Sequence, residues 1–169
     1  MNQVSIRDAQ ESDFEAIVEL NDAEVQQTSA MDMERLRHLD GISCYHKVAC
    51  IDGTACAFLL AMQQDSPYTS ENFLWFVARY SAFVYVDRIV VSASFARHKL
   101  GTILYTDLFG YARARDIPLI TCEYNIVPAN EASRRFHDKF GFEEVGTQWV
   151  ANGTKRVSLQ VAKASCEED

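Results

Sequence analysis

The first part of the chain alternates short apolar runs with polar turns, a pattern that predicts strands joined by tight connections. Residues 4–7 form the first predicted strand, and the capping-box pair Ser12 and Glu15 predicts a helix start behind it. Four apolar residues define one face of this helix: Phe14, Ile17, Val18 and Val25. A weaker helical pattern covers residues 33–39. Residues 45–51 and 54–62 are apolar, and the Asp52-Gly53 pair between them predicts a hairpin turn.

The middle of the chain predicts a strand, a helix and a further strand. Residues 63–72 are polar and contain a proline, so we expect a loop there. The β-branched and aromatic segment 83–92 predicts a strand, and residues 118–124 predict another. Between them, residues 99–115 carry an apolar helical stripe made of Leu100, Ile103, Leu104, Leu108 and Ala112. Consecutive strand, helix and strand favour a right-handed crossover between parallel strands.

The last third predicts a helix over residues 130–140, closed by Gly141 at its C′ position. A hairpin over residues 143–161 follows, turned at Asn152-Gly153. We expect residues 163–169 to be a frayed tail and residues 1–162 to be a single domain. The elements together predict an α/β (α+β) domain with a mixed sheet, mostly antiparallel, that has one parallel pair in its middle.

Composition narrows the class of protein further. A chain of 169 residues with 48% hydrophobic residues is long and apolar enough for one packed core. The longest apolar run, residues 55–62, is too short to span a bilayer, and the polar N-terminus does not resemble a signal peptide, so we expect a cytoplasmic protein. The formal net charge of -8 argues against nucleic acid as a partner. The five cysteines include no CxxC pair, which argues against structural zinc and suits a reducing compartment.

One basic cluster stands out on this acidic chain. Arg97, His98 and Lys99 come after a predicted strand, and Gly101 lies in the first turn of the helix that follows. Backbone N–H groups at a helix start lack partners within the helix and favour anions. The cluster therefore predicts a site for a phosphate-bearing cofactor.

Three stretches resemble one known family, and together they cover nearly the whole chain. IRDAQESDFEAIVELN resembles the first strand and helix of the GCN5-related N-acetyltransferases (the GNAT superfamily). IVVSASFARHKLGTIL resembles the acetyl-CoA motif of that family, and NEASRRFHDKFGF resembles its N-x-x-A-x-x-x-Y-x-x-x-G-F helix. The resemblance implies a mixed sheet whose central parallel strands splay apart, flanked by helices. It also implies acetyl-CoA as cosubstrate and direct attack on the thioester by a primary amine in a ternary complex.

The resemblance assigns cofactor contacts to matching positions. The residues implied are Ile89, Val90, Val91, Arg97, His98, Lys99, Leu100, Gly101, Thr102, Asn130 and Phe136. Two positions depart from the family pattern. Ala96, Arg97 and Lys99 stand where the family has Arg, Gly and Gly, and Lys99 fits this loop if its φ angle is negative. His137 stands where the family has a tyrosine that acts as general acid.

Three residues are candidates for proton transfer. Asp87 and Arg88 lie in an otherwise apolar strand, where an unpaired charge is costly. Asp87 is therefore a candidate base or an anchor for a cationic amine, and the alternative is a buried structural ion pair. Adjacent strand residues point to opposite faces, so we do not expect these two to pair unless a bulge re-aims one of them. Glu123 ends a predicted strand and is a second candidate base, with a solvated rim carboxylate as the alternative. His137 is the candidate acid, with a half-buried helical histidine as the alternative.

The amine that accepts the acetyl group is predicted from fewer residues than the cosubstrate is. The aromatic residues before the central strand are expected to be mostly core, and a minority of them to line an acceptor pocket. The candidate acceptor contacts are Trp75, Tyr80, Tyr85, Tyr124 and Asn125. The net charge favours a small or cationic amine. A non-catalytic CoA-binding module and a structural or interaction domain stay open as alternatives, and the last hairpin allows a homodimer as well as pairing within one sheet.

Overall fold

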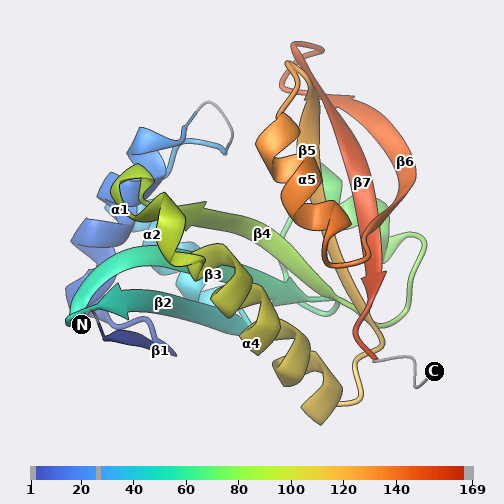
Figure 1. Ribbon diagram of the computed structural model, residues 1–169. Helices are drawn as coiled ribbons and strands as arrows, with labels where there is room; N and C mark the ends of the chain where they lie inside the picture. Colours follow the sequence, from blue (N-terminus) through green and yellow to red (C-terminus); the bar gives the residue numbers. More distant parts are fainter. Residues whose placement is uncertain (1–2, 26–27, 166–169) are drawn as a thin grey trace. The chain divides into compact units, whose positions relative to one another are not determined.

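The computed structural model describes residues 3–25 and 28–165, which divide into two compact units. The first unit comprises Met1–Met62 and Asp87–Leu108, and the second comprises Gln63–Val86 and Phe109–Asp169. Strand β4 and helix α4 contribute to both units, and β3 reaches the second unit with its last residue, Gln63. Figure 1 gives the labels of the helices and strands. Whether residues 1–162 act as one domain stays a prediction.

The first unit holds the early strands and two helices. Its elements are β1 (Val4–Asp8), the 3₁₀ turn η1 (Glu11–Asp13), α1 (Phe14–Ala23), α2 (Met33–Ile42), β2 (Tyr45–Ile51), β3 (Thr54–Gln63), the second half of β4 (Val84–Val91), the 3₁₀ turn η2 (Ala93–His98) and the start of α4 (Leu100–Ala114). The β2–β3 hairpin turns at Asp52 and Gly53, whose φ angles are 50° and 84°, which confirms the predicted turn.

The start of the first helix differs from the prediction. Asp13, not Ser12, organises it: a carboxylate oxygen of Asp13 accepts a bond of 2.8 Å from the Gln10 N–H. Arg7 donates two further bonds to the same carboxylate, at 2.6 and 2.8 Å, and holds the pKa of Asp13 below its ordinary value. A 3₁₀ turn therefore precedes the helix. Val25 is also misassigned, because α1 ends at Ala23 and Val25 is exposed.

The second unit holds the later elements. These are α3 (Glu71–Val77), the first half of β4, the end of α4, β5 (Leu119–Val127), α5 (Glu131–Asp138), β6 (Glu143–Val150) and β7 (Lys155–Lys163). The predicted loop of residues 63–72 missed the start of α3, whose buried Phe73 and Phe76 are three residues apart. The predicted aromatic core is confirmed for Phe73, Phe76, Phe83 and Tyr85, each 1% exposed or less.

Hydrogen bonding orders the seven strands β1-β2-β3-β4-β5-β7-β6. Strands β4 and β5 are parallel, whereas β1–β2, β2–β3, β5–β7 and β6–β7 are antiparallel. This confirms the predicted mixed, mostly antiparallel sheet with a central parallel pair. Among the described residues, the β4–β5 ladder comprises the pairs Val84↔Ile120 and Tyr85↔Thr121.

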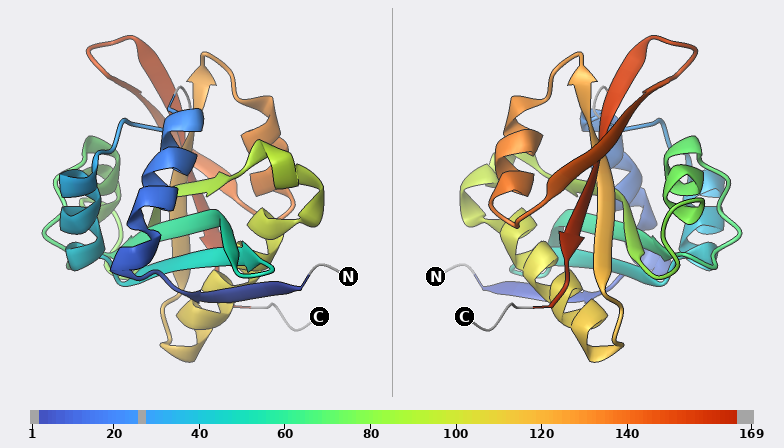
Figure 2. Two further views of the ribbon diagram at one scale, coloured as in Figure 1. Left: turned by 90° about the vertical axis from the view of Figure 1, so that its left-hand side faces the viewer. Right: turned by 90° about the vertical axis from the view of Figure 1, so that its right-hand side faces the viewer.

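The C-terminal hairpin pairs within the sheet. Strand β7 pairs with β5 along one edge and with β6 along the other, as the labels of Figure 1 show, and Figure 2 gives two further views of these strands. The turn is longer than the predicted Asn152-Gly153 pair, because Val150 opposes Lys155 and Ala151, Asn152 and Gly153 all have positive φ angles. Strand β7 reaches Lys163, and Ala164 is buried. Residues 166–169 of the predicted tail lie outside the described residues.

Candidate active site

The β4–α4 connection of the first unit carries the predicted phosphate site. Strand β4 leads into the 3₁₀ turn η2, and α4 begins at Leu100 directly after Lys99. The Arg97 and Lys99 side chains are exposed, whereas His98 is half-buried. Within the described residues, the buried Nδ1 of His98 has no hydrogen-bond partner. Two exposed cations and an unsatisfied ring nitrogen thus lie at the start of a helix of 15 residues.

Lys99 adopts the left-handed conformation, so the condition of a negative φ angle is not met. Its φ and ψ angles are 55° and 34°, and its carbonyl accepts the bond from the Ile103 N–H that begins α4. A side chain with a Cβ pays about 1–2 kcal/mol in this region, where glycine fits without strain. The backbone here therefore keeps the glycine-type conformation that the family pattern expects, while the side chain adds a positive charge.

Asp87 and Arg88 pair directly with each other, contrary to the expectation from strand alternation. Arg88 Nε lies 2.7 Å from Asp87 Oδ2, and the two side chains are only 3% and 5% exposed. Alternation fixes where each Cβ points, but the long arginine side chain lets its guanidinium reach back to the neighbouring carboxylate. The geometry is that of a buried ion pair, the alternative to a catalytic base.

The guanidinium of Arg88 also holds the segment after α1. Its Nη1 donates bonds of 3.0 Å to Asn21 Oδ1 and to the Ser29 carbonyl, and its Nη2 donates a bond of 3.0 Å to Ser29 Oγ. Asn21 is fully buried and donates from its own amide to the same Ser29 carbonyl. Asp87 and Arg88 therefore join β4 to the described residues that follow α1.

Glu123 is held by Tyr85 in the second unit. The Tyr85 hydroxyl lies 2.8 and 2.7 Å from the two carboxylate oxygens of Glu123. Tyr85 is 1% exposed, with its ring packed against Phe73 and Phe76, so the structure places this candidate acceptor contact in the aromatic core. Glu123 is half-buried and comes two residues after Thr121, the last β5 residue paired with β4. A carboxylate fixed at this point can accept a proton or hold an ammonium group.

His137 is buried in α5 with one ring nitrogen engaged. Its Nδ1 lies 2.7 Å from the Ser133 carbonyl, and because a carbonyl only accepts, Nδ1 carries the proton of the neutral ring. Burial lowers the pKa of His137 below its ordinary value, and the bond to Ser133 offsets this only in part. The ring stands 5.5 Å from that of Tyr124 and 5.2 Å from that of Phe142, measured between centroids. At neutral pH this histidine is therefore uncharged.

The remaining candidates take varied places in the second unit. Asn130 caps α5, its Oδ1 accepting from the Ser133 N–H at 3.2 Å. Phe136 packs against Phe140 with ring centroids 5.3 Å apart. Trp75 lies between Arg79, whose guanidinium is 3.8 Å from its ring, and Gly146, where an added Cβ would stand 2.5 Å from the indole. Tyr80 is half-buried beside Phe76.

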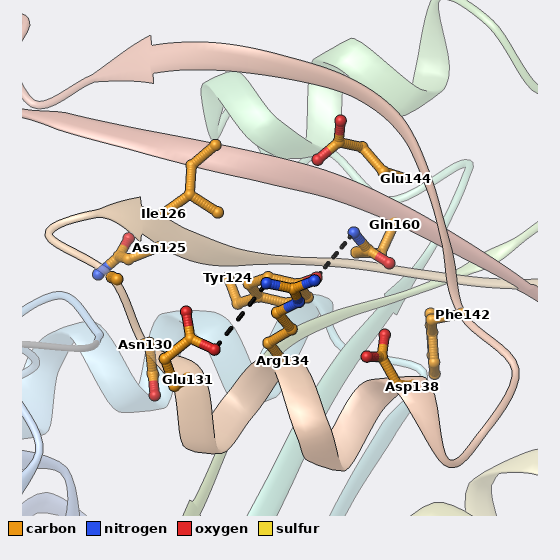
Figure 3. A pocket seen from close by; sticks show the side chains of 11 residues that line it. Tyr124, Asn125, Ile126, Asn130, Glu131, Arg134, Asp138, Phe142, Glu144 and Gln160 are labelled. Carbon is orange, nitrogen blue, oxygen red and sulfur yellow. Dashed lines mark hydrogen bonds and ion pairs between the residues drawn. The ribbon is translucent and has the colours of Figure 1, made fainter.

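Tyr124 and Asn125 line a pocket of about 500 Å³ in the second unit, shown in Figure 3. The walls come from β5, α5, β6 and β7, and the remaining lining residues are Ile126, Ala129, Asn130, Glu131, Arg134, Asp138, Phe142, Glu144 and Gln160. Tyr124 accepts a bond of 3.1 Å from Gln160 Nε2. Burial, followed by the charge of Asp138, raises the pKa of Tyr124, so its hydroxyl stays protonated.

Sequence reasoning missed most residues of this pocket. Glu131, Arg134 and Asp138 recur at helical spacing on α5, which predicts a shared face but not what that face meets. Ser158 and Gln160 alternate as polar residues in an otherwise apolar strand, and both are at least 98% buried. That alternation was the available signal for a polar site on β7.

The described residues contain neither a membrane-spanning helix nor a metal-binding cluster. None of their helices has the length and apolar character needed to cross a membrane. Within the same part of the chain, no group of three or more His, Cys, Asp or Glu residues is placed to hold a metal ion.

Comparison with known proteins gives a consistent result. Residues 4–142 match the family model described as "Acetyltransferase (GNAT) family". No curated protein gave a significant match. Among solved structures, Ard1 from Thermoplasma volcanium is similar with a TM-score of 0.76 at 15% identity, covering 95% of this chain and 97% of that one.

Two further solved structures are similar over nearly their whole length. The ribosomal-protein-S18-alanine N-acetyltransferase from Escherichia coli has a TM-score of 0.73 at 13% identity, with 99% of this chain and 97% of that chain covered. The putative acetyltransferase yncA from Salmonella typhimurium, solved with acetyl-CoA, has a TM-score of 0.72 at 16% identity and the same coverage. At these identities the likeness shows a shared fold.

Proposed function

Because the chain belongs to the GNAT family of acetyltransferases, we propose that it transfers an acetyl group from acetyl-CoA to a primary amine. The observation that carries this proposal is the β4–α4 connection, which lies inside the matched residues. Exposed Arg97 and Lys99 stand there at the start of a long helix, on a chain of net charge -8. Binding of a phosphate-bearing cosubstrate explains this local positive charge.

The residues present fit the phosphates of CoA. The glycine-type backbone at Lys99 keeps the helix start in the geometry that exposes its amides, and the ammonium group adds a charge that glycine lacks. The unsatisfied Nδ1 of His98 offers one more polar contact at the same place. We assign phosphate binding to residues Arg97, His98, Lys99 and Gly101, and keep Leu100, Thr102 and the β4 residues Ile89, Val90 and Val91 as predicted contacts of the cosubstrate.

Acetyl-CoA supplies an activated acyl group on a thiol leaving group. The amine loses a proton, its nitrogen forms a bond to the carbonyl carbon, the C–S bond breaks, and the thiolate takes up a proton. We assign acceptance of the amine proton to Glu123, because Tyr85 holds both of its oxygens and fixes its position. We assign a structural role to Asp87, because its carboxylate neutralises the charge of the buried Arg88 guanidinium.

Proton donation is not assigned to His137 at neutral pH. The neutral ring carries its proton on Nδ1, which the Ser133 carbonyl already accepts, and burial keeps the pKa of the ring low. We propose that His137 supports the aromatic contacts of α5 and that water returns the proton to the thiolate.

A small, cationic amine is the acceptor class that the charges favour. The net charge of -8 attracts cations, and the pocket in the second unit has three carboxylates against one arginine. Structural relatives named for phosphinothricin and for a ribosomal-protein alanine differ in acceptor, so they do not narrow the choice. Tyr85 lies in the aromatic core, and Trp75 is covered by Arg79 and Gly146. We therefore keep Tyr80, Tyr124 and Asn125 as the predicted acceptor contacts.

The first experiment measures thermal unfolding with and without acetyl-CoA or CoA, followed by thiol release with a panel of primary amines. Ligand at about 100 times its dissociation constant adds roughly 2.7 kcal/mol of stability, a clear rise in Tm. Glu123→Gln is expected to lower kcat by about 10²–10⁴-fold with acetyl-CoA binding unchanged, whereas Glu143→Gln, at an exposed position on β6, serves as the matched control. No rise in Tm with either ligand would refute the proposal.

A second candidate function is a CoA-binding module without turnover. The observations that favour it are the lysine in the phosphate loop and the neutral, buried His137. It predicts the same rise in Tm but no thiol release with any amine.

A further inference from the structure

Strand β6 forms one edge of the sheet in the second unit. The strand order ends at β6, and among the described residues only β7 pairs with it (Figure 1). No described strand therefore pairs with the N–H and C=O groups on the other side of β6. Lysine and proline commonly protect such edges, and the sequence of β6, EEVGTQWV, contains neither. Backbone hydrogen bonding can add a further strand to an edge of this kind.

A bulge affects only the first part of β6. The register with β7 shifts between Glu144 and Gly146, so Val145 is the extra residue. Residues 146–150 then pair with β7 in one unbroken register. The second half of the strand is therefore regular enough to serve as a template for pairing.

Two large apolar side chains of β6 are exposed. Val145 is 40% exposed and Trp149 is 55% exposed. The guanidinium of Arg156 lies 5.9 Å from the centroid of the Trp149 ring, and Arg156 Nη2 donates a bond of 2.9 Å to Thr147 Oγ1. A tryptophan that is exposed beside a fixed arginine is a typical anchor of a protein interface.

The charges of the last hairpin are divided between the two ends of β6. The strand begins at Glu143, which is exposed. Lys155 and Arg156 lie on β7 beside the other end, where they pair with Val150 and Trp149. Two antiparallel copies of β6 bring the acidic start of each strand to the basic end of the other, whereas parallel copies place like charges side by side. The charges therefore favour antiparallel pairing of two identical strands.

The exposed apolar side chains select one register of such a pair. Around a two-fold axis, residues that lie opposite each other project from the same face of the sheet. When Thr147 lies opposite its own copy, Trp149 of each strand lies opposite Val145 of the other. This register also sets Glu143 opposite Ala151, in the turn that precedes Lys155. Both exposed apolar side chains of β6 are thus covered in each copy.

We propose that β6 pairs antiparallel with β6 of a second copy of this chain and forms a two-fold symmetric dimer. The proposal rests on the edge of the sheet and does not depend on the transferase activity, so its test needs no turnover. One strand from each copy makes a small interface, below about 1,200 Å², the size found in weak and transient complexes. We therefore expect a dissociation constant on the order of 1–100 µM.

The test is sedimentation equilibrium of the whole chain between about 1 and 300 µM, a range that brackets this dissociation constant. The mean mass should rise with concentration from that of one copy toward twice that value. Trp149→Glu places a charge opposite Val145 and should raise the dissociation constant about 10-fold or more. Leu74→Glu is the matched control, because Leu74 is 46% exposed on α3 of the same unit and gains the same charge outside β6. It should change the dissociation constant by less than about two-fold.

A charge exchange tests the antiparallel arrangement separately. Glu143→Lys and Lys155→Glu each bring like charges together and should weaken the dimer about two- to five-fold, the size expected for exposed ion pairs. The double variant restores opposite charges and should bind within about two-fold of the original chain. These changes lie at the ends of the hairpin strands, so they keep the test decisive if Trp149→Glu fails to fold.

Three results would overturn the proposal: a single-copy mass at about 300 µM, a dimer that a folded Trp149→Glu variant leaves unchanged, or equal losses in Leu74→Glu and Trp149→Glu. A double variant that is weaker than either single variant would overturn the antiparallel arrangement of the two strands.

Discussion

Replacing Asp87 by asparagine distinguishes a structural ion pair from a catalytic base at this position. The change keeps an oxygen that can accept from Arg88 Nε but removes the countercharge of a guanidinium whose side chain is 3% exposed. Breaking a buried ion pair by removing one partner costs about 3–5 kcal/mol. Arg88 keeps three hydrogen bonds of 3.0 Å to Asn21 and Ser29, so we expect the lower end, about 3 kcal/mol, in the free energy of unfolding.

The chain offers a matched control for this measurement. Glu11 and Arg37 form an ion pair with the same 2.7 Å separation, but their side chains are 63% and 55% exposed. Glu11→Gln should therefore cost about 0–1 kcal/mol in the same urea titration. The two pairs share the same N–O distance and differ strongly in burial.

The result that would refute this reasoning is specific. If Asp87→Asn unfolds at the same urea concentration as Glu11→Gln yet loses thiol release by about 10²-fold or more, Asp87 is a base rather than a structural ion. If Asp87→Asn is destabilised by about 3 kcal/mol and keeps its turnover well below its Tm, the structural assignment stands.

Three other predictions follow from single features of the structure. Lys99→Gly removes a lysine in the left-handed conformation, so the free energy of unfolding should rise by about 1 kcal/mol. Calorimetry of the same variant should show acetyl-CoA binding weakened about two- to five-fold. Equal affinity for acetyl-CoA would mean that the ammonium group of Lys99 does not contact the phosphates. Gly146→Ala places a Cβ 2.5 Å from the Trp75 indole and should cost about 1–3 kcal/mol in thermal unfolding, whereas Gly41→Ala in α2, with nothing within 4 Å, should add about 0.5–1 kcal/mol. Burial lowers the folded pKa of His137 below 6.5, so its contribution to stability is full above pH 6.5 and is lost as the pH falls toward the folded pKa. His137→Gln should flatten the fall in Tm between pH 7 and pH 5, and an unchanged slope would contradict this assignment.

Local signals predicted most of the elements, because they act between residues that are close in sequence. Asp52-Gly53 needs only its own positive φ angles to turn the chain, and Gly141 at φ 79° ends α5 in the same local way. The family motifs are also local strings, and they gave the sheet with its parallel central pair. Two short elements were not predicted correctly. The start of α3 lies in a polar stretch that resembles a loop, and the start of α1 depends on the bond from Arg7 to Asp13.

The candidate site was predictable only as a set of residue types. The basic cluster before α4 could be read from the sequence, but the positive φ of Lys99 could not, because lysine ordinarily avoids that conformation. Asp87 was recognised as unusual, yet its pairing with its own neighbour depended on the path of a long side chain.

What the sequence determined by itself is the order of the elements, the family and the position of the basic cluster before α4, since each depends on neighbouring residues. The tertiary structure alone decided that Tyr85 holds Glu123, 38 positions away, and that β7 brings Gln160 to Tyr124 from 36 positions away. The physical reason is that such partners are selected by strand register and packing, which depend on the whole chain rather than on any local string.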